Sequence, residues 1–205
     1  PDENVLAHGS LDRGIYLHGL ATGETRELWG HNHYVARLAF SPDGEILASG
    51  SDDHTVRLWR VADGEEIQKL VVEGTVNDVR FSPDGDIVAF CDRQGHVHVF
   101  EIVHDDYRKS VFVELGSAEA LAFIPQTKQI VVSSVNGVVR FLNLESFQVE
   151  RTLKIADGNL RDVQCSPDGR TLAIARDHEI RLVDVHSGRT IQVFPLSDWA
   201  NRTNF

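Results

Sequence analysis

The sequence predicts an all-β protein built from repeated four-stranded antiparallel units. A tight-turn motif, FSPDG, stands at residues 40–44 and 81–85, returns as CSPDG at 165–169, and is degraded to FIPQ at 123–126. The prolines of these copies are 41, 42 and 42 residues apart, a period typical of modular arrays. Between the turns, apolar residues alternate over short runs and never follow a long helical period, so we expect strands and almost no helix.

The clearest unit shows how each element arises. Residues 34–40 alternate their larger apolar side chains, and the turn that follows supplies a proline with fixed φ and a glycine for a positive φ. Residues 46–49 form a small apolar strand, and residues 55–59 form a third strand after a polar turn. The fourth strand, at 66–70, is more polar, as is typical of an outer edge strand that meets water.

This unit resembles a WD40 repeat, the four-stranded blade of a β-propeller. The motifs that carry the resemblance are GH at 30–31, LAFSPDG at 38–44, LASGS at 47–51, Asp53, and TVRLW at 55–59. In weaker form the resemblance extends over essentially the whole chain. It implies a buried hydrogen-bond network of His31, Ser49, Asp53 and Trp59, which fixes the blade rather than performing chemistry.

The other units depart from this pattern. The Trp59 position holds His18, Phe100, Leu142 and Val183, and the Asp53 position holds Asp12, Gln94, Asn136 and, allowing one deletion, Asp177. These blades must depend mainly on apolar packing, which yields about 1.5 to 3 kcal/mol for each large buried side chain. We therefore expect the blade of residues 31–72 to be the most rigid.

The two ends of the chain complement each other. The first unit lacks its innermost strand, while WANRTNF at 199–205 aligns with YVARLAF at 34–40. This predicts five blades, with the C-terminal strand completing the N-terminal blade and closing the ring. The predicted blades are 1–30 with 196–205, 31–72, 73–115, 116–156 and 157–195. The alternative is a segment of a larger propeller, because seven blades are usual in the family that the chain resembles.

Composition limits the possible partners. The net charge is −11, which disfavours nucleic acid because such partners reward the neutralisation of phosphates. No apolar run approaches the roughly 20 residues that cross a bilayer, so no membrane partner is expected. The two cysteines, Cys91 and Cys165, are too few for a disulfide scaffold. We expect a cytoplasmic, monomeric domain, and the absence of methionine together with the start at Pro1 favours excision from a larger protein.

Catalytic and metal motifs receive little support. The chain has no phosphate-binding glycine loop, nucleophile elbow or His-Glu-x-x-His, so we expect neither an enzyme nor a cofactor. His96 and His98 would point to one face of a strand, and His31 stands close to His33, which suggests metal ligation. However, His98 aligns with Arg57 and Arg140, so ordinary strand and structural roles are favoured and no metal is expected.

A binding function has better support, although it depends partly on the resemblance. WD40 propellers present rigid ring faces to other proteins, and aromatic and arginine side chains most often anchor interfaces. The residues predicted for one such face are Trp199, Tyr34, His33, Arg13, His54, Arg93, Arg176 and His178. Trp199 is the first candidate, with packing at a blade junction as its alternative role.

The predicted function is therefore a non-catalytic module that binds a protein or peptide, as a scaffold or sensor domain. The alternative is a propeller that binds a small molecule or metal, or an accessory domain of a multidomain enzyme.

Overall fold

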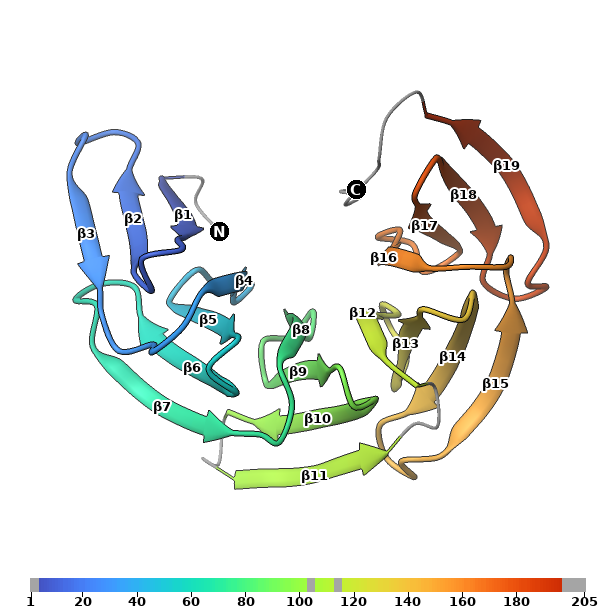
Figure 1. Ribbon diagram of the computed structural model, residues 1–205, viewed down its shortest axis with the longest axis horizontal. Helices are drawn as coiled ribbons and strands as arrows, with labels where there is room; N and C mark the ends of the chain where they lie inside the picture. The colour runs from blue at the N-terminus through green and yellow to red at the C-terminus, as the bar shows by residue number, and fades with distance from the viewer. Residues whose placement is uncertain (1–3, 103–105, 113–115, 197–205) are drawn as a thin grey trace. The chain divides into compact units, whose positions relative to one another are not determined.

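The computed structural model describes residues 4–102, 106–112 and 116–196, and within them the chain consists of five antiparallel sheets without a helix (Figure 1). The first sheet contains β1 (Val5–Gly9), β2 (Ile15–Gly19) and β3 (Thr25–Leu28). The second contains β4 (Val35–Phe40), β5 (Ile46–Ser51), β6 (Thr55–Arg60) and β7 (Glu66–Val71). The third contains β8 (Val76–Phe81), β9 (Ile87–Asp92), β10 (His96–Glu101) and β11 (Asp106–Phe112). The fourth contains β12 (Ala118–Phe123), β13 (Gln129–Ser134), β14 (Val138–Asn143) and β15 (Val149–Lys154). The fifth contains β16 (Leu160–Cys165), β17 (Thr171–Arg176), β18 (Glu179–Asp184) and β19 (Thr190–Pro195).

Strands that follow one another in sequence are neighbours in every sheet. The prediction of an all-β chain of short antiparallel strands is therefore confirmed. In the second sheet, β5 and β6 are almost entirely buried, while the last strand β7 is largely exposed, as is β19 at the edge of the fifth sheet. This polar last strand is the edge that meets solvent.

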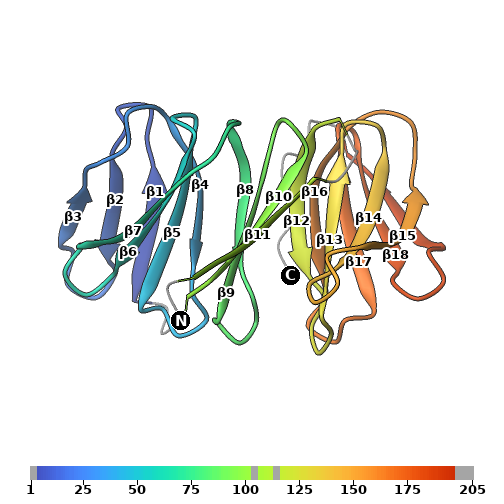
Figure 2. The ribbon, with the colours of Figure 1, turned by 90° about the horizontal axis from the view of Figure 1, so that it is seen from below.

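The chain divides into two compact units, Pro1–Gln94 with His98–Ser110, and Gly95–Val97 with Val111–Phe205. The boundary falls within the hairpin β9–β10, whose strands are hydrogen-bonded neighbours in one sheet. In Figure 2, which shows the ribbon from below, most strands run from the top to the bottom of the view, and the turns that join them lie at the top and at the bottom.

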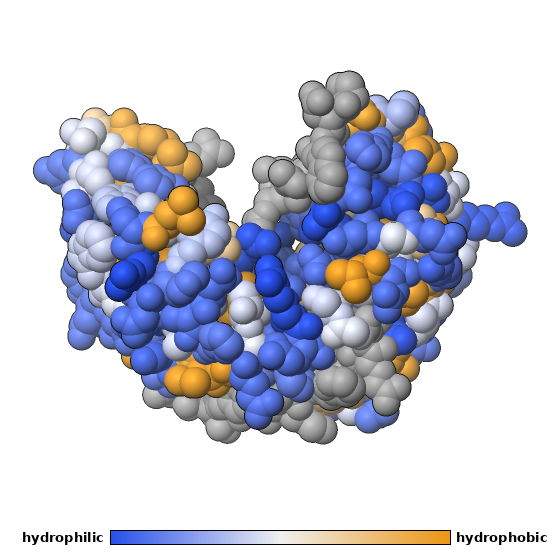
Figure 3. All heavy atoms as spheres, viewed as in Figure 1, coloured by the Kyte–Doolittle hydropathy of each residue, from blue (hydrophilic) through white to orange (hydrophobic). Residues whose placement is uncertain are grey.

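Apolar faces of adjacent sheets pack together inside each unit. In the first unit, Trp59 and Leu47 of the second sheet pack with Ile15 of the first, and on the other side Leu58 packs with Phe90 of the third. In the second unit, Phe141 of the fourth sheet packs with Leu172 of the fifth. The surface in Figure 3 is mostly hydrophilic, with hydrophobic side chains scattered over it, which is normal for a folded domain.

Small residues let adjacent sheets approach closely. A Cβ atom placed on Gly50 of β5 would lie 2.6 Å from Cγ1 of Val76, the first residue of β8. The equivalent Gly9 of β1 lies against Val35, the first residue of β4, in the same way. Glycine is required here because the neighbouring sheet occupies the space of any side chain.

The repeated turn is closed by its own side chains. Ser41 donates from Oγ to Asp43 Oδ1 (2.5 Å) and accepts from the Ile46 N–H (2.9 Å). Ser82 and Ser166 make the same pair of bonds in their copies of the turn. Gly44 has a φ of 77°, the positive value that its place in the motif predicts.

Some predictions concern residues outside the described part of the chain. They include Trp199, the strand expected at 199–205, and its pairing that would close a ring. Within the described residues, none forms a helix of the length and hydropathy needed to span a membrane.

Candidate functional site

A buried hydrogen-bond network joins His31, Ser49, Asp53 and Trp59, the four residues grouped by the resemblance. His31 Nδ1 lies 2.9 Å from Asp53 Oδ2, and His31 Nε2 lies 2.7 Å from Ser49 Oγ. Trp59 donates from Nε1 to the same Ser49 oxygen (2.8 Å). Thr55 adds a bond from Oγ1 to Asp53 Oδ1 (2.6 Å). The network ties the segment before β4 to β5, β6 and the turn between them.

Electrostatics favour a neutral His31 in this network. Burial lowers the pKa of His31, against the opposing effect of Asp53. Burial alone would raise the pKa of Asp53, but hydrogen bonds from Thr55, the Asn32 N–H and His31 lower it to about 2. Because Asp53 only accepts, His31 donates from Nδ1 and its Nε2 accepts from the Ser49 hydroxyl. This arrangement stabilises the sheet and offers no reactive group.

Five residues predicted for a partner-binding face lie in loops of the first unit: Arg13, His33, Tyr34, His54 and Arg93. All are exposed except Tyr34, which is half-buried. Each loop either enters the first strand of a sheet or joins its second and third strands; Arg13 lies in the corresponding turn, between β1 and β2.

Backbone hydrogen bonds hold these loops at the same end of their strands. The bonds run from Val35 N to Ser10 O (3.4 Å), from Asp52 N to Tyr34 O (3.1 Å) and from Arg93 N to Thr75 O (3.1 Å). In addition, His54 donates from ring Nδ1 to the Glu73 carbonyl (2.9 Å). The loops of the first unit therefore form a connected, hydrogen-bonded surface.

Two of these residues have a left-handed backbone. Arg13 has a φ of 79° and His54 a φ of 65°. The same turn position holds Gly95 in β9–β10 and Gly137 in β13–β14, both also with positive φ. A non-glycine residue in this conformation costs roughly 1 kcal/mol. The chain thus keeps a large side chain at two positions where glycine would be less strained, a pattern that is more frequent at functional sites.

In the second unit, Arg176 is the last residue of β17, and His178 lies in the turn between β17 and β18. His178 is exposed and Arg176 is half-buried. Arg176 pairs through Nη1 with Glu179 Oε1 (2.6 Å) and donates from Nη2 to the Asp157 carbonyl. These intramolecular bonds reduce the capacity of Arg176 to anchor a partner.

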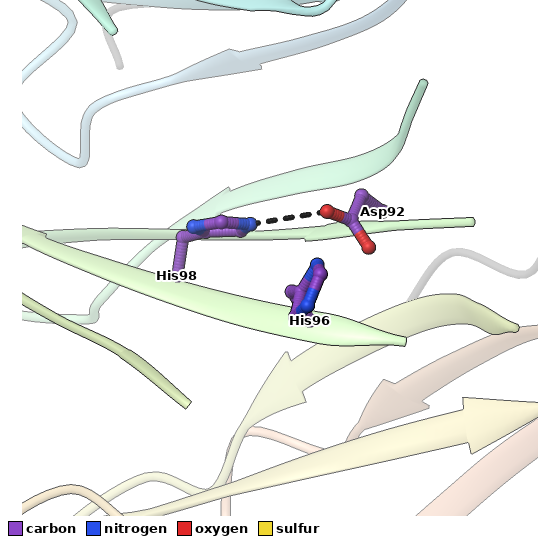
Figure 4. Close-up of side chains that lie close together, drawn as sticks. All are labelled: Asp92, His96 and His98. Carbon is purple, nitrogen blue, oxygen red and sulfur yellow. Dashed lines mark hydrogen bonds and ion pairs between the residues drawn. The ribbon is translucent and has the colours of Figure 1, made fainter. Parts of the chain in front are cut away.

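The structure also brings together three residues that the sequence did not group. Asp92, His96 and His98 each offer one metal-ligating atom, and these atoms all lie within 4.8 Å of one another. In Figure 4 the His96 ring points toward the gap between the Asp92 carboxylate and the His98 ring. The alternation of His96 and His98 along β10 was visible in the sequence. The contribution of Asp92 was not, because it depends on how β9 pairs with β10.

Comparison with known proteins relates part of this chain to a family of repeats. The model of the WD domain, G-beta repeat, matches residues 23–60 and 64–101. A WD repeat-containing protein, SL1-17 of Schistosoma mansoni, is 31% identical over 101 residues, which cover 47% of this chain and 32% of the relative. Two WD40 repeats therefore lie within residues 23–101 of this chain. The chain spans about a third of the length of the curated relative that it matches.

The matched repeats are offset from the sheets. The first runs from just before β3 to the end of β6, so it begins with the outer strand of one sheet and continues into three strands of the next. Each repeat therefore links two adjacent sheets covalently. WD40 repeats generally mediate protein–protein interactions, and proteins built from them are typically non-catalytic.

Proposed function

We propose that this WD40-repeat chain is a five-bladed β-propeller domain of a larger protein, in which residues 196–205 pair with β1 and close the ring. Two observations support closure: the first sheet has three strands among the described residues where the others have four, and the C-terminal residues 199–205 align with 34–40. Its blades would be residues 1–30 with 196–205, 31–72, 73–115, 116–156 and 157–195.

Deletion of residues 196–205 tests closure. A closed ring loses the inner strand of one blade, and a cost of about 3 kcal/mol lowers the melting midpoint of a chain this long by roughly 6 to 12 °C. A synthetic peptide of residues 196–205 should restore the midpoint, whereas a peptide of scrambled order should not. A truncated chain that melts with the intact one would show that these residues do not complete a blade.

The domain acts in this proposal as a non-catalytic scaffold or sensor that binds a protein or peptide on the loop surface of Arg13, His33, Tyr34, His54 and Arg93, continued by Trp199. The observation that carries the proposal is the retention of Arg13 and His54 at left-handed positions where two other turns, β9–β10 and β13–β14, have glycine. Arginine and aromatic side chains on rigid loops lose little entropy on binding and can make bidentate or large contacts.

The experiment replaces Arg13 and His54 with glycine, the residue that the β9–β10 and β13–β14 turns have at this position. Arg13→Gly with His54→Gly relieves backbone strain but increases the freedom of the unfolded chain by a similar amount, so stability should change by less than about 1 kcal/mol. Capture from lysate by the intact chain, followed by measurement of Kd with the purified partner, should show at least a tenfold loss in the double variant.

A matched control is Arg60→Ala at the opposite end of β6. Arg60 is about half exposed and pairs there with Asp63, and an exposed pair contributes little to stability. Partner affinity should survive this change. Equal affinity of the double glycine variant and the intact chain would place the binding surface elsewhere. Trp199→Ala with Tyr34→Ala then tests the remainder of the surface.

We also propose a cytoplasmic location and a monomeric domain. Cys91 and Cys165 are not joined in a disulfide, which is typical of proteins in reducing compartments. Fluorescent tagging of the parent protein and the solution mass of the domain test these two statements.

A further inference from the structure

The hairpin β9–β10 contains an Asp-x-x-x-His-x-His segment whose three polar residues converge. Asp92 is the last residue of β9, while His96 and His98 are the first and third residues of β10. Seven consecutive residues thus supply a carboxylate and two imidazoles (Figure 4). Imidazole and carboxylate are ligands that Zn²⁺ and similar divalent ions accept together.

The distances are close to those of a coordination site. His98 Nε2 lies 3.2 Å from Asp92 Oδ2, and two ligands of a tetrahedral zinc ion are separated by about 3.3 Å. Because all three ligand atoms lie within 4.8 Å of one another, some point lies within about 2.8 Å of all three. Bonds of about 2.0 to 2.2 Å then need only small side-chain rotations.

Burial and packing preorganise two of the ligands. The Asp92 side chain is 0% exposed and that of His98 is 6% exposed. The His98 ring is stacked on Phe90, with centroids 4.9 Å apart and planes 10° apart, which fixes the direction of its nitrogen atoms. A buried carboxylate must be compensated by hydrogen bonds, charge or metal. His96 is half-buried and leaves a route for an ion to enter.

Equivalent positions in the fifth sheet show that this hairpin geometry directs three side chains to one point. There the last residue of β17 and the first and third residues of β18 are Arg176, Glu179 and Arg181. Glu179 pairs with both arginines, at 2.6 and 2.5 Å. The same positions hold Ser51, Thr55 and Arg57 in the second sheet and Ser134, Val138 and Arg140 in the fourth. Only the third of the four-stranded sheets has metal-ligating residues at all three positions.

We propose that Asp92, His96 and His98 form a binding site for Zn²⁺ or a similar divalent transition-metal ion. The ion displaces the hydrogen bond between His98 and Asp92, since an imidazole nitrogen that binds metal carries no proton. Three protein ligands leave a fourth position of a tetrahedral ion for water or for a ligand from a partner.

Titration of the metal-stripped chain with ZnCl₂ in a calorimeter tests the site, with CoCl₂ absorption as an independent spectroscopic reading. We expect one saturable ion per chain and cobalt d–d bands typical of four or five ligands. At a zinc concentration 100 times Kd, the unfolding equilibrium should move about 100-fold toward the folded state.

Two variants isolate the ligands. His96→Val introduces the residue that the fourth sheet carries at this position, Val138, and it changes the least buried ligand. Asp92→Asn keeps the shape and removes the charge. Each should weaken Kd at least tenfold and abolish the zinc-dependent stabilisation, while circular dichroism in chelator establishes that the variants fold.

The matched control is the pair of exposed His33 and half-buried Asp52, whose nearest ring nitrogen and carboxylate oxygen are 3.8 Å apart. His33→Gln should leave zinc affinity unchanged. The proposal is overturned if the intact chain shows no saturable binding, if folded His96→Val binds as tightly as the intact chain, or if His33→Gln removes the binding.

Discussion

Substitution of Ser49 by alanine should destabilise the chain out of proportion to the atom removed. The Ser49 hydroxyl is fully buried and is bonded to Trp59 Nε1–H at 2.8 Å and His31 Nε2 at 2.7 Å. Ser49→Ala leaves both of these buried groups without that partner. Each unsatisfied group costs about 1 to 3 kcal/mol, so two of them should lower the free energy of unfolding by about 2 to 6 kcal/mol.

Urea unfolding at pH 7.5 and 25 °C measures this loss, with the slope m showing whether the unfolded state has changed. Ser133→Ala is the control, because Ser133 is equally buried but makes one longer bond, to the Ala120 carbonyl at 3.3 Å. It should cost less than about 1 kcal/mol.

A double-mutant cycle with Trp59→Phe separates the network from simple packing. Once the indole N–H is absent, Ser49→Ala leaves only His31 unsatisfied, so its cost should fall by about 1 to 3 kcal/mol. Equal costs of Ser49→Ala and Ser133→Ala, or additivity of Ser49→Ala with Trp59→Phe, would refute the reasoning that the hydroxyl joins these groups.

Two further predictions concern acid and sheet spacing. Because the pKa of His31 is lowered in the folded state, the unfolded chain binds the proton more readily, and stability present above pH 6.5 should decline as the pH falls below it. Asp53, with a pKa of about 2 against an ordinary 3.8, adds a loss below pH 4 of about 1 to 2 kcal/mol after allowance for solvent screening. Urea midpoints of the intact chain and of His31→Gln measure this; the same decline between pH 7 and pH 5 in both would contradict the role of His31. Gly50→Ala should cost about 1 to 3 kcal/mol, since its Cβ would lie 2.6 Å from Val76. Val76→Ala in the Gly50→Ala chain should recover part of that cost, and a Gly50→Ala chain as stable as the parent would show that the sheets can separate freely.

Much of the fold could be predicted from the sequence because its determinants are local. Alternating apolar residues and the proline and glycine of the repeated turn act within a few residues of each strand. The network of His31, Ser49, Asp53 and Trp59 could be grouped only through the family resemblance, since these residues are up to 28 positions apart in the chain.

The candidate site was less predictable because it depends on pairing between strands. Two histidines separated by one residue reveal a common face of a strand, but Asp92 joins them only when β9 and β10 are placed side by side. Likewise, Arg176 was chosen as an exposed anchor from its place in a turn. Its bond to Glu179 depends on the side-chain packing around that turn, which no residue spacing specifies.

The self-closed turn of Ser41, Asp43 and Ile46 affects the order of events when the chain folds. Its hydrogen bonds span five residues at most, so the loop-closure entropy that opposes them is small. Hairpins of this kind form in microseconds, whereas contacts between distant segments form more slowly. We therefore expect each copy of the turn to nucleate its own hairpin during synthesis, before the sheets pack, so that folding proceeds from several independent starting points along the chain.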